Sequence, residues 1–188
     1  MIASHAGCYF TPATGSGEGD AGIQPPSELF GADARMVDGG GMACPSQSPL
    51  ISMRVRVRTT TPGGRYSPRN VGAIWIETEG GMFVKTIERW AGTRARWLTK
   101  FNASSASNLV DAVTSATLAQ HTTHDRTWNL TNLTRCEIPP GNYRVVVEMT
   151  DKNGTGPSIT MPFTMNDTPM TLMPPETTNF HDLLIELK

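Results

Sequence analysis

Alternating apolar and polar residues begin near residue 50 and recur along the rest of the chain. In ISMRVRVRT the apolar side chains would share one face of a strand and the arginines the other; the apolar set is Ile51, Met53, Val55 and Val57. Later segments rich in Val, Ile, Thr and aromatic residues also read as strands: VGAIWIET, MFVKTIERW, RTWNLT, NYRVVVEMT, SITMPFTM and LLIELK. Turn sequences such as EGG, PPG and DKNG separate several of them. The pattern predicts an all-β protein, an immunoglobulin-like antiparallel β-sandwich over residues 50–188.

Helical periodicity is weak throughout the chain. The segment SNLVDAVTSATL predicts one or two helical turns, with Ser107 or Asn108 as the cap.

Residues 1–49 differ in character from the rest of the sequence. They alternate Gly, Pro and Ser clusters with short polar pieces, which predicts a flexible, disordered tether. Ala6-Gly7-Cys8 matches the last three positions of a bacterial lipobox, so one interpretation is lipidation at Cys8 behind an apolar segment upstream of Met1. The alternative is an unpaired cysteine in a disordered tail.

Composition and cysteine spacing narrow the functional classes. Charged residues make up 18% of the chain and the net charge is −1, which gives no broad electrostatic footprint for nucleic acid. We expect contact with a membrane only through a lipid anchor. Cys44 and Cys136 could form a disulfide in an exported protein, which would stabilise the fold by roughly 3–5 kcal/mol. None of the cysteines has metal-ligand spacing.

Two stretches resemble known families. The pattern V-K-T-I, T-W-N and I-P-P-G-N-Y-R-V-V-V resembles the immunoglobulin-like module of the flagellar hook-capping protein FlgD. From RYSPRNVGAIWIE onward, the chain is similar to a family of predicted periplasmic bacterial proteins of unknown function that carry this module. Those relatives read T-W-D-G where this chain has Thr127-Trp128-Asn129-Leu130. The resemblance implies a sandwich fold and a periplasmic or extracellular location, but sandwich modules serve many functions.

The segment DAVTSAT resembles the acceptor motif of proteins modified by the flavin transferase ApbE. In that family the enzyme moves FMN from FAD onto the final hydroxyl of the motif. Carried over by position, Asp111 is the acid, Thr114 the inner hydroxyl, Ala116 the alanine and Thr117 the acceptor. Ser115 replaces a glycine, at a cost on the order of 1–2 kcal/mol if that glycine has a positive φ. The alternative is a capped structural turn.

This resemblance implies an extracytoplasmic electron-transfer protein that carries covalent FMN and has no substrate of its own. Its partners would be a flavin transferase and an envelope redox protein. Trp90, Trp97 and Trp128 could contact the isoalloxazine ring, although core packing explains each of them as well. The rival hypothesis is a non-catalytic immunoglobulin-like module that binds a partner or has a structural role in the envelope.

His121 and His124 form a second candidate site. Imidazoles three residues apart share a side only in a helix, so Asp125 or His181 would have to complete a copper or zinc site. Surface histidines at the start of a strand are the simpler interpretation.

Overall fold

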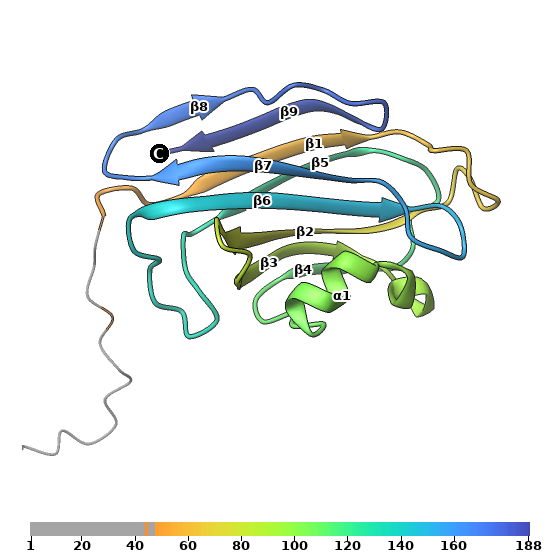
Figure 1. Ribbon diagram of the computed structural model, residues 1–188, viewed down its shortest axis with the longest axis horizontal. Coiled ribbons are helices and arrows are strands. Elements are labelled where there is room, and N and C mark those ends of the chain that lie inside the picture. Colours follow the sequence, from red (N-terminus) through yellow and green to blue (C-terminus); the bar gives the residue numbers. More distant parts are fainter. Residues whose placement is uncertain (1–43, 45–47) are drawn as a thin grey trace, which may run out of the picture. The chain divides into compact units, whose positions relative to one another are not determined.

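The computed structural model describes Cys44 and residues 48–188, which form two β-sheets packed face to face (Figure 1). One sheet has the strand order β5-β1-β9-β8; its strands are β5 (Thr123–Trp128), β1 (Met53–Thr59), β9 (Phe180–Leu187) and β8 (Met170–Leu172). The other has the order β4-β3-β2-β6-β7; its strands are β4 (Val113–Ser115), β3 (Phe83–Trp90), β2 (Val71–Thr78), β6 (Gly141–Thr150) and β7 (Ser158–Met165). The all-β sandwich predicted from the sequence is confirmed.

Strand β4 is the exception to the antiparallel order. It pairs in parallel with the end of β3, whereas the other strand pairs are antiparallel. The three loops that precede β2, follow β3 and follow β4 therefore meet at one end of the sandwich (Figure 1).

The main core lies between the two sheets and follows the predicted alternation in β1. Met53, Val55 and Val57 are buried there, facing Ile74 and Ile76 of β2 among others. The inward orientation predicted for the first apolar residue of the segment was wrong: Ile51 is 77% exposed because it precedes the strand, which begins at Met53.

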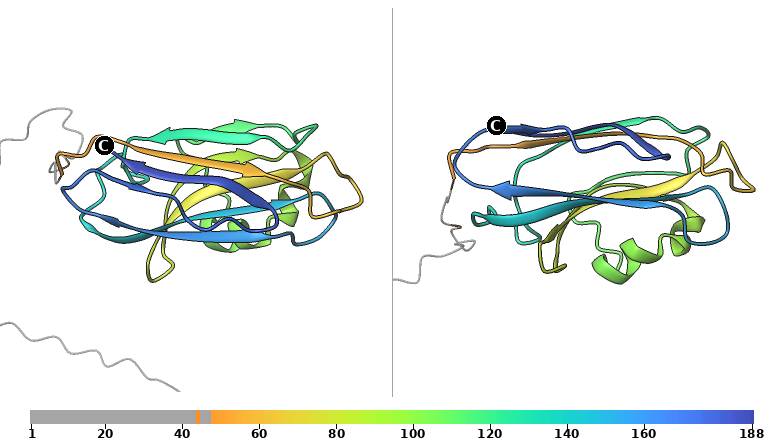
Figure 2. Two further views of the ribbon diagram at one scale, coloured as in Figure 1. Left: turned by 90° about the horizontal axis from the view of Figure 1, so that it is seen from above. Right: turned by 45° about the horizontal axis from the view of Figure 1, so that its top comes forward.

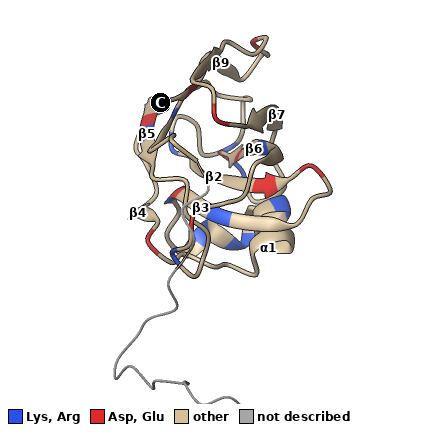
Figure 3. Ribbon diagram, turned by 90° about the vertical axis from the view of Figure 1, so that its left-hand side faces the viewer, with Lys and Arg blue, Asp and Glu red and all other residues tan. Residues whose placement is uncertain are grey.

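A second, smaller core covers the outer face of the larger sheet. The 3-10 helix η1 (Thr93–Trp97) and helix α1 (Thr99–Ser105) lie over this face. Figure 2 and the end-on view in Figure 3 show α1 on the side of the larger sheet that faces away from the smaller sheet. Phe101 packs edge-on against Trp75, with ring centroids 5.5 Å apart. Strand β2 is buried on both faces, which explains its nearly continuous apolar sequence.

The helix predicted near residues 107–118 was wrong in position. Helix α1 ends at Ser105, and Val113–Ser115 form strand β4 instead. The Glu148 carboxylate accepts hydrogen bonds from the backbone N–H groups of Lys100 and Phe101, at 3.3 and 2.9 Å, and so fixes the start of α1.

A disulfide and a side-chain hydrogen bond fix the loop between β5 and β6. A disulfide joins Cys44 to Cys136, and the Tyr143 hydroxyl donates a 2.7 Å hydrogen bond to the carbonyl of Pro139. The second contact is of the kind that fixes a corner in immunoglobulin-like sandwiches. Cys8, the predicted lipidation site, lies outside the described residues, and the domain boundary predicted at residue 50 stays a prediction. In the described part of the chain, no helix has the length and apolar character needed to cross a membrane.

Candidate functional site

Residues 111–117, called the acceptor segment only because their sequence resembles the flavin-acceptor motif, run along the exposed edge of the larger sheet. Its central residues form β4, where Val113, Thr114 and Ser115 pair with Glu88, Arg89 and Trp90 of β3. All three residues of β4 are exposed. The segment is therefore an extended edge strand, accessible to another protein along its length.

Asp111 anchors the first end of the acceptor segment. Its carboxylate accepts a hydrogen bond from Lys85 Nζ at 3.0 Å and lies 3.3 Å from Arg135 Nη2. Hydrogen bonds from Arg135 and Lys85 hold the pKa of Asp111 below its ordinary value. Asp111 has a φ of 55°, so the chain turns here before it enters β4. These ion pairs fix the position of Asp111 at the start of the segment.

Ser115 occupies the position at which flavin-acceptor motifs have glycine. It lies in β4 and is not among the residues with positive φ. The energetic cost expected for serine at this position required a positive φ. Because the φ of Ser115 is not positive, serine is not strained here. Ala116 follows it as a second small, exposed side chain.

Thr117 lies just beyond β4 and is partly exposed. Its Oγ1 has no hydrogen-bond partner among the described residues. A Cβ atom built on Gly92 would lie 3.7 Å from this oxygen, so a residue without a side chain borders the hydroxyl. The next residue, Leu118, exchanges two backbone hydrogen bonds with Asn70, at 3.1 and 3.0 Å. The backbone on both sides of Thr117 is thus paired, through β4 and Leu118, whereas the hydroxyl makes no hydrogen bond within the described residues.

A buried polar cluster lies on β3 and β5, beside the start of β4. His124 is buried, and its ring stacks on the Trp90 ring with centroids 3.7 Å apart. The distance from its Nδ1 to the Glu88 carboxylate is 3.0 Å. The other oxygen of Glu88 accepts a 2.7 Å hydrogen bond from Arg126. Burial alone would raise the pKa of Glu88, but hydrogen bonds and charges from His124 and Arg126 outweigh it and hold the pKa below its usual value.

The two histidines do not form a metal site in the described part of the chain, where no group of three or more His, Cys, Asp or Glu side chains could hold a metal ion. His124 faces the interior, whereas His121 Nδ1 lies 3.3 Å from the Thr59 hydroxyl. Burial lowers the pKa of His121. Asp125 is paired with Arg54, and His181 with Glu176, so neither completes the predicted site.

The three tryptophans proposed as flavin contacts have different surroundings. Trp90 and Trp128 are core residues, 0% and 4% exposed. Trp97 is only partly buried and lies at the end of η1, five residues after Gly92. Of the three, only Trp97 lies outside the cores.

Sequence reasoning did not predict the cluster of Glu88, His124 and Arg126. The strand sequence THDRTW could have indicated it, because alternate residues of a strand share a face. His124, Arg126 and Trp128 therefore lie on one face of β5. These three residues pair with Val57, Val55 and Met53, so the face is the inner one.

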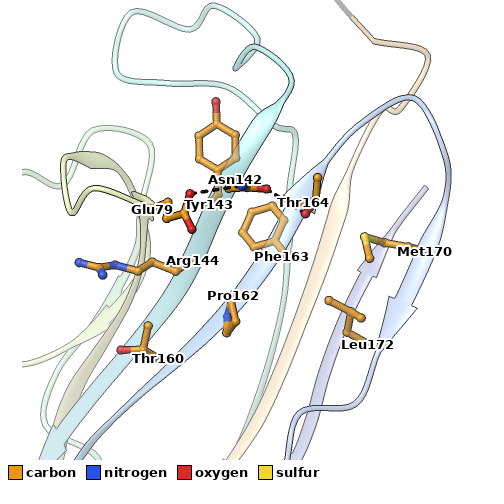
Figure 4. A pocket seen from close by; sticks show the side chains of 10 residues that line it. All are labelled: Glu79, Asn142, Tyr143, Arg144, Thr160, Pro162, Phe163, Thr164, Met170 and Leu172. Atoms are coloured by element: carbon orange, nitrogen blue, oxygen red, sulfur yellow. Dashed lines mark hydrogen bonds between the residues drawn. The ribbon is translucent and has the colours of Figure 1, made fainter.

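A groove lies elsewhere, across β6, β7 and β8 (Figure 4). Three of its polar side chains are bonded to one another: Asn142 donates to Glu79 at 3.2 Å and accepts from Thr164 at 3.0 Å. Phe163, Met170 and Leu172 supply its apolar lining. No residue of the acceptor segment contributes to it.

These observations define an immunoglobulin-like β-sandwich with a disulfide and an exposed edge strand that carries hydroxyl side chains. Residues 53–177 match the family described as predicted periplasmic proteins, DUF2271, and the chain belongs to that family. The periplasmic location expected from the sequence agrees with this description. No curated protein and no solved structure matches the chain.

Proposed function

We propose that this protein is an extracytoplasmic flavin carrier, with FMN attached to the hydroxyl of Thr117. The observation that supports the proposal best is the state of this side chain. Thr117 lies at the end of an exposed edge strand, and its Oγ1 has no hydrogen-bond partner in the described part of the chain. A hydroxyl that a second enzyme modifies needs this combination of access and freedom.

The neighbouring residues suit the approach of a transferase. Ser115 and Ala116 are small and exposed, and Gly92 adds no side chain next to the hydroxyl. The exposed β4 also offers a docking edge, because a strand at the end of a sheet leaves one row of backbone groups unpaired.

The attachment step conserves atoms and charge through a simple exchange. The Thr117 oxygen forms a bond to the FMN phosphorus of FAD, the pyrophosphate bond breaks and AMP leaves. The proton of the hydroxyl passes to a base of the transferase. When attached, FMN supplies the redox chemistry, and this chain contributes the position and the electrostatic surroundings of the flavin.

An envelope redox protein would then deliver or remove electrons at this end of the sandwich. The rigid β-sandwich holds the acceptor at one place, because β4 is paired to β3 and Leu118 to Asn70 on the two sides of Thr117.

The test is co-expression with a flavin transferase in a host that exports both proteins. We expect a fluorescent band on a denaturing gel and an intact mass increased by that of one FMN less one water. Thr117→Val should remove both signals. Thr114→Val is the matched control, since Thr114 is an exposed threonine in the same segment. Wild-type protein that stays unmodified beside an active transferase would refute the proposal and favour the non-catalytic binding module.

A further inference from the structure

Three loops surround Thr117 at one end of the sandwich. Residues 60–70 lead into β2 and reach the segment through the bridge between Asn70 and Leu118. Residues 91–98 follow β3 and approach Thr117 at Gly92. The third loop, residues 116–122, carries Thr117 itself.

These loops carry arginines without acidic residues to balance them. Arg65 and Arg69 lie in the first loop, and Arg94 and Arg96 in the second; we call these four the arginine cluster. Residues 60–72, 91–110 and 112–124 contain no Asp or Glu. The first loop contacts the carboxylate of Asp151, which accepts a 2.6 Å hydrogen bond from the Thr61 hydroxyl. Asp151 is only 1% exposed.

The arginine cluster differs from most other arginines of the described chain. Five arginines elsewhere form ion pairs with carboxylates: Arg54, Arg58, Arg126, Arg135 and Arg144. No member of the arginine cluster has such a pair among the described residues. In a chain whose net charge is −1, this concentration of unpaired positive charge at one end is a local feature.

One guanidinium of the cluster is held in place. The Cζ atom of Arg94 lies 3.5 Å from the centre of the Tyr66 ring, and the ring is fixed by a 2.9 Å hydrogen bond from Asn153 to its hydroxyl. The Cζ atom of Arg65 lies 5.8 Å from the same ring centre. Stacking on an aromatic ring leaves the N–H groups of arginine free to bind the oxygens of a phosphate.

We propose that the arginine cluster is a phosphate-binding surface that holds the phosphate group of FMN beside Thr117. The inference rests on the proposed function for the identity of the ligand, and it assigns the recognition of that ligand to this chain as well as to the transferase. Arg94 and Arg69 are the main candidates, because they lie two residues from Gly92 and next to Asn70. The planar guanidinium and the phosphate oxygens match in geometry and charge.

The experiment uses the full chain with Thr117→Val, so that no covalent bond can form. Quenching of flavin fluorescence measures the affinity for FMN and for riboflavin, which differ only in the phosphate. We expect FMN to bind at least about tenfold more tightly than riboflavin, and the difference to shrink as salt is added. Arg69→Ala with Arg94→Ala should bring the ratio close to one.

Two further variants control for charge and folding. Arg56→Ala with Lys188→Ala removes the same charge from the other sheet and should keep the ratio. Arg65→Ala with Arg69→Ala leaves the Arg94–Tyr66 contact in place and should lower the ratio in part. Equal affinity for FMN and riboflavin, no measurable binding of FMN at millimolar concentration, or an unchanged ratio in both arginine variants would overturn the inference. These outcomes are independent of covalent attachment, which the co-expression experiment tests separately.

Discussion

Removal of the disulfide between Cys44 and Cys136 should lower the stability of the sandwich by several kcal/mol. The bond closes a loop with a sequence separation of 92 residues. In the chain-entropy description, closing a loop of this length lowers the entropy of the unfolded chain by about 15.6 cal/mol/K, which corresponds to about 4.6 kcal/mol at 25 °C. Both cysteines are partly exposed, so serine at these positions adds no large cost of burying a hydroxyl.

The assay is equilibrium unfolding in urea, followed by tryptophan fluorescence, for the wild type and the variant Cys44→Ser with Cys136→Ser. We expect a loss of about 3–5 kcal/mol and a steeper dependence on urea, because the unfolded variant is less compact. Reduced wild-type protein should behave like the variant. The folded spectra should agree, because β5 and β6 flank the loop of Cys136 and keep their own strand partners.

A loss below about 1 kcal/mol would contradict this reasoning. So would an unfolding midpoint of the wild type that does not change on reduction.

Three further predictions concern access, charge and packing. Gly92→Val should slow flavin attachment at Thr117, measured by mass spectrometry over time, whereas Gly154→Val should not, since a Cβ there meets nothing within 4 Å. The folded-state pKa of Glu88 lies below its unfolded value, so its contribution to stability is complete above the unfolded pKa of about 4.3 and disappears as the pH falls through the folded pKa. Glu88→Gln should therefore flatten the acid limb of the stability curve, and an unchanged limb would exclude this role. Phe101→Ala should cost about 3–5 kcal/mol in urea unfolding, because the ring is fully buried against Trp75.

The strands of the core could be predicted from the sequence because each carries a periodic signal. In β1, every second residue from Met53 to Val57 is apolar and buried. Strand β2 reads as an almost continuous apolar run, since α1 covers its outer face. Both patterns depend only on which faces of the strand are buried, and the order of apolar and polar residues in the sequence shows which faces these are.

The acceptor segment could be found from its motif, but its conformation could not. Val113–Ser115 are all exposed, so they carry no alternation, and their strand state comes from pairing with the edge of β3. The helix lies earlier in the chain because Phe101 packs on Trp75 and the Glu148 carboxylate accepts hydrogen bonds from the first turn of α1. These are contacts between residues distant in sequence, which local propensity does not contain.

The arginine cluster illustrates the same limit at the level of the site. Arg69 and Arg94 lie in different loops, and neither loop has a recognisable motif. Only the pairing of Asn70 with Leu118 and the position of Gly92 bring both loops to Thr117.

The central claim is tested most directly by locating the modified atom. After co-expression with a flavin transferase, trypsin should release residues 101–126 as one peptide, which contains the whole acceptor segment. The account predicts that fragmentation of this peptide places a single FMN on Thr117. A flavin found on Thr114 or Ser115, or a peptide that remains unmodified while the transferase is active, would contradict it.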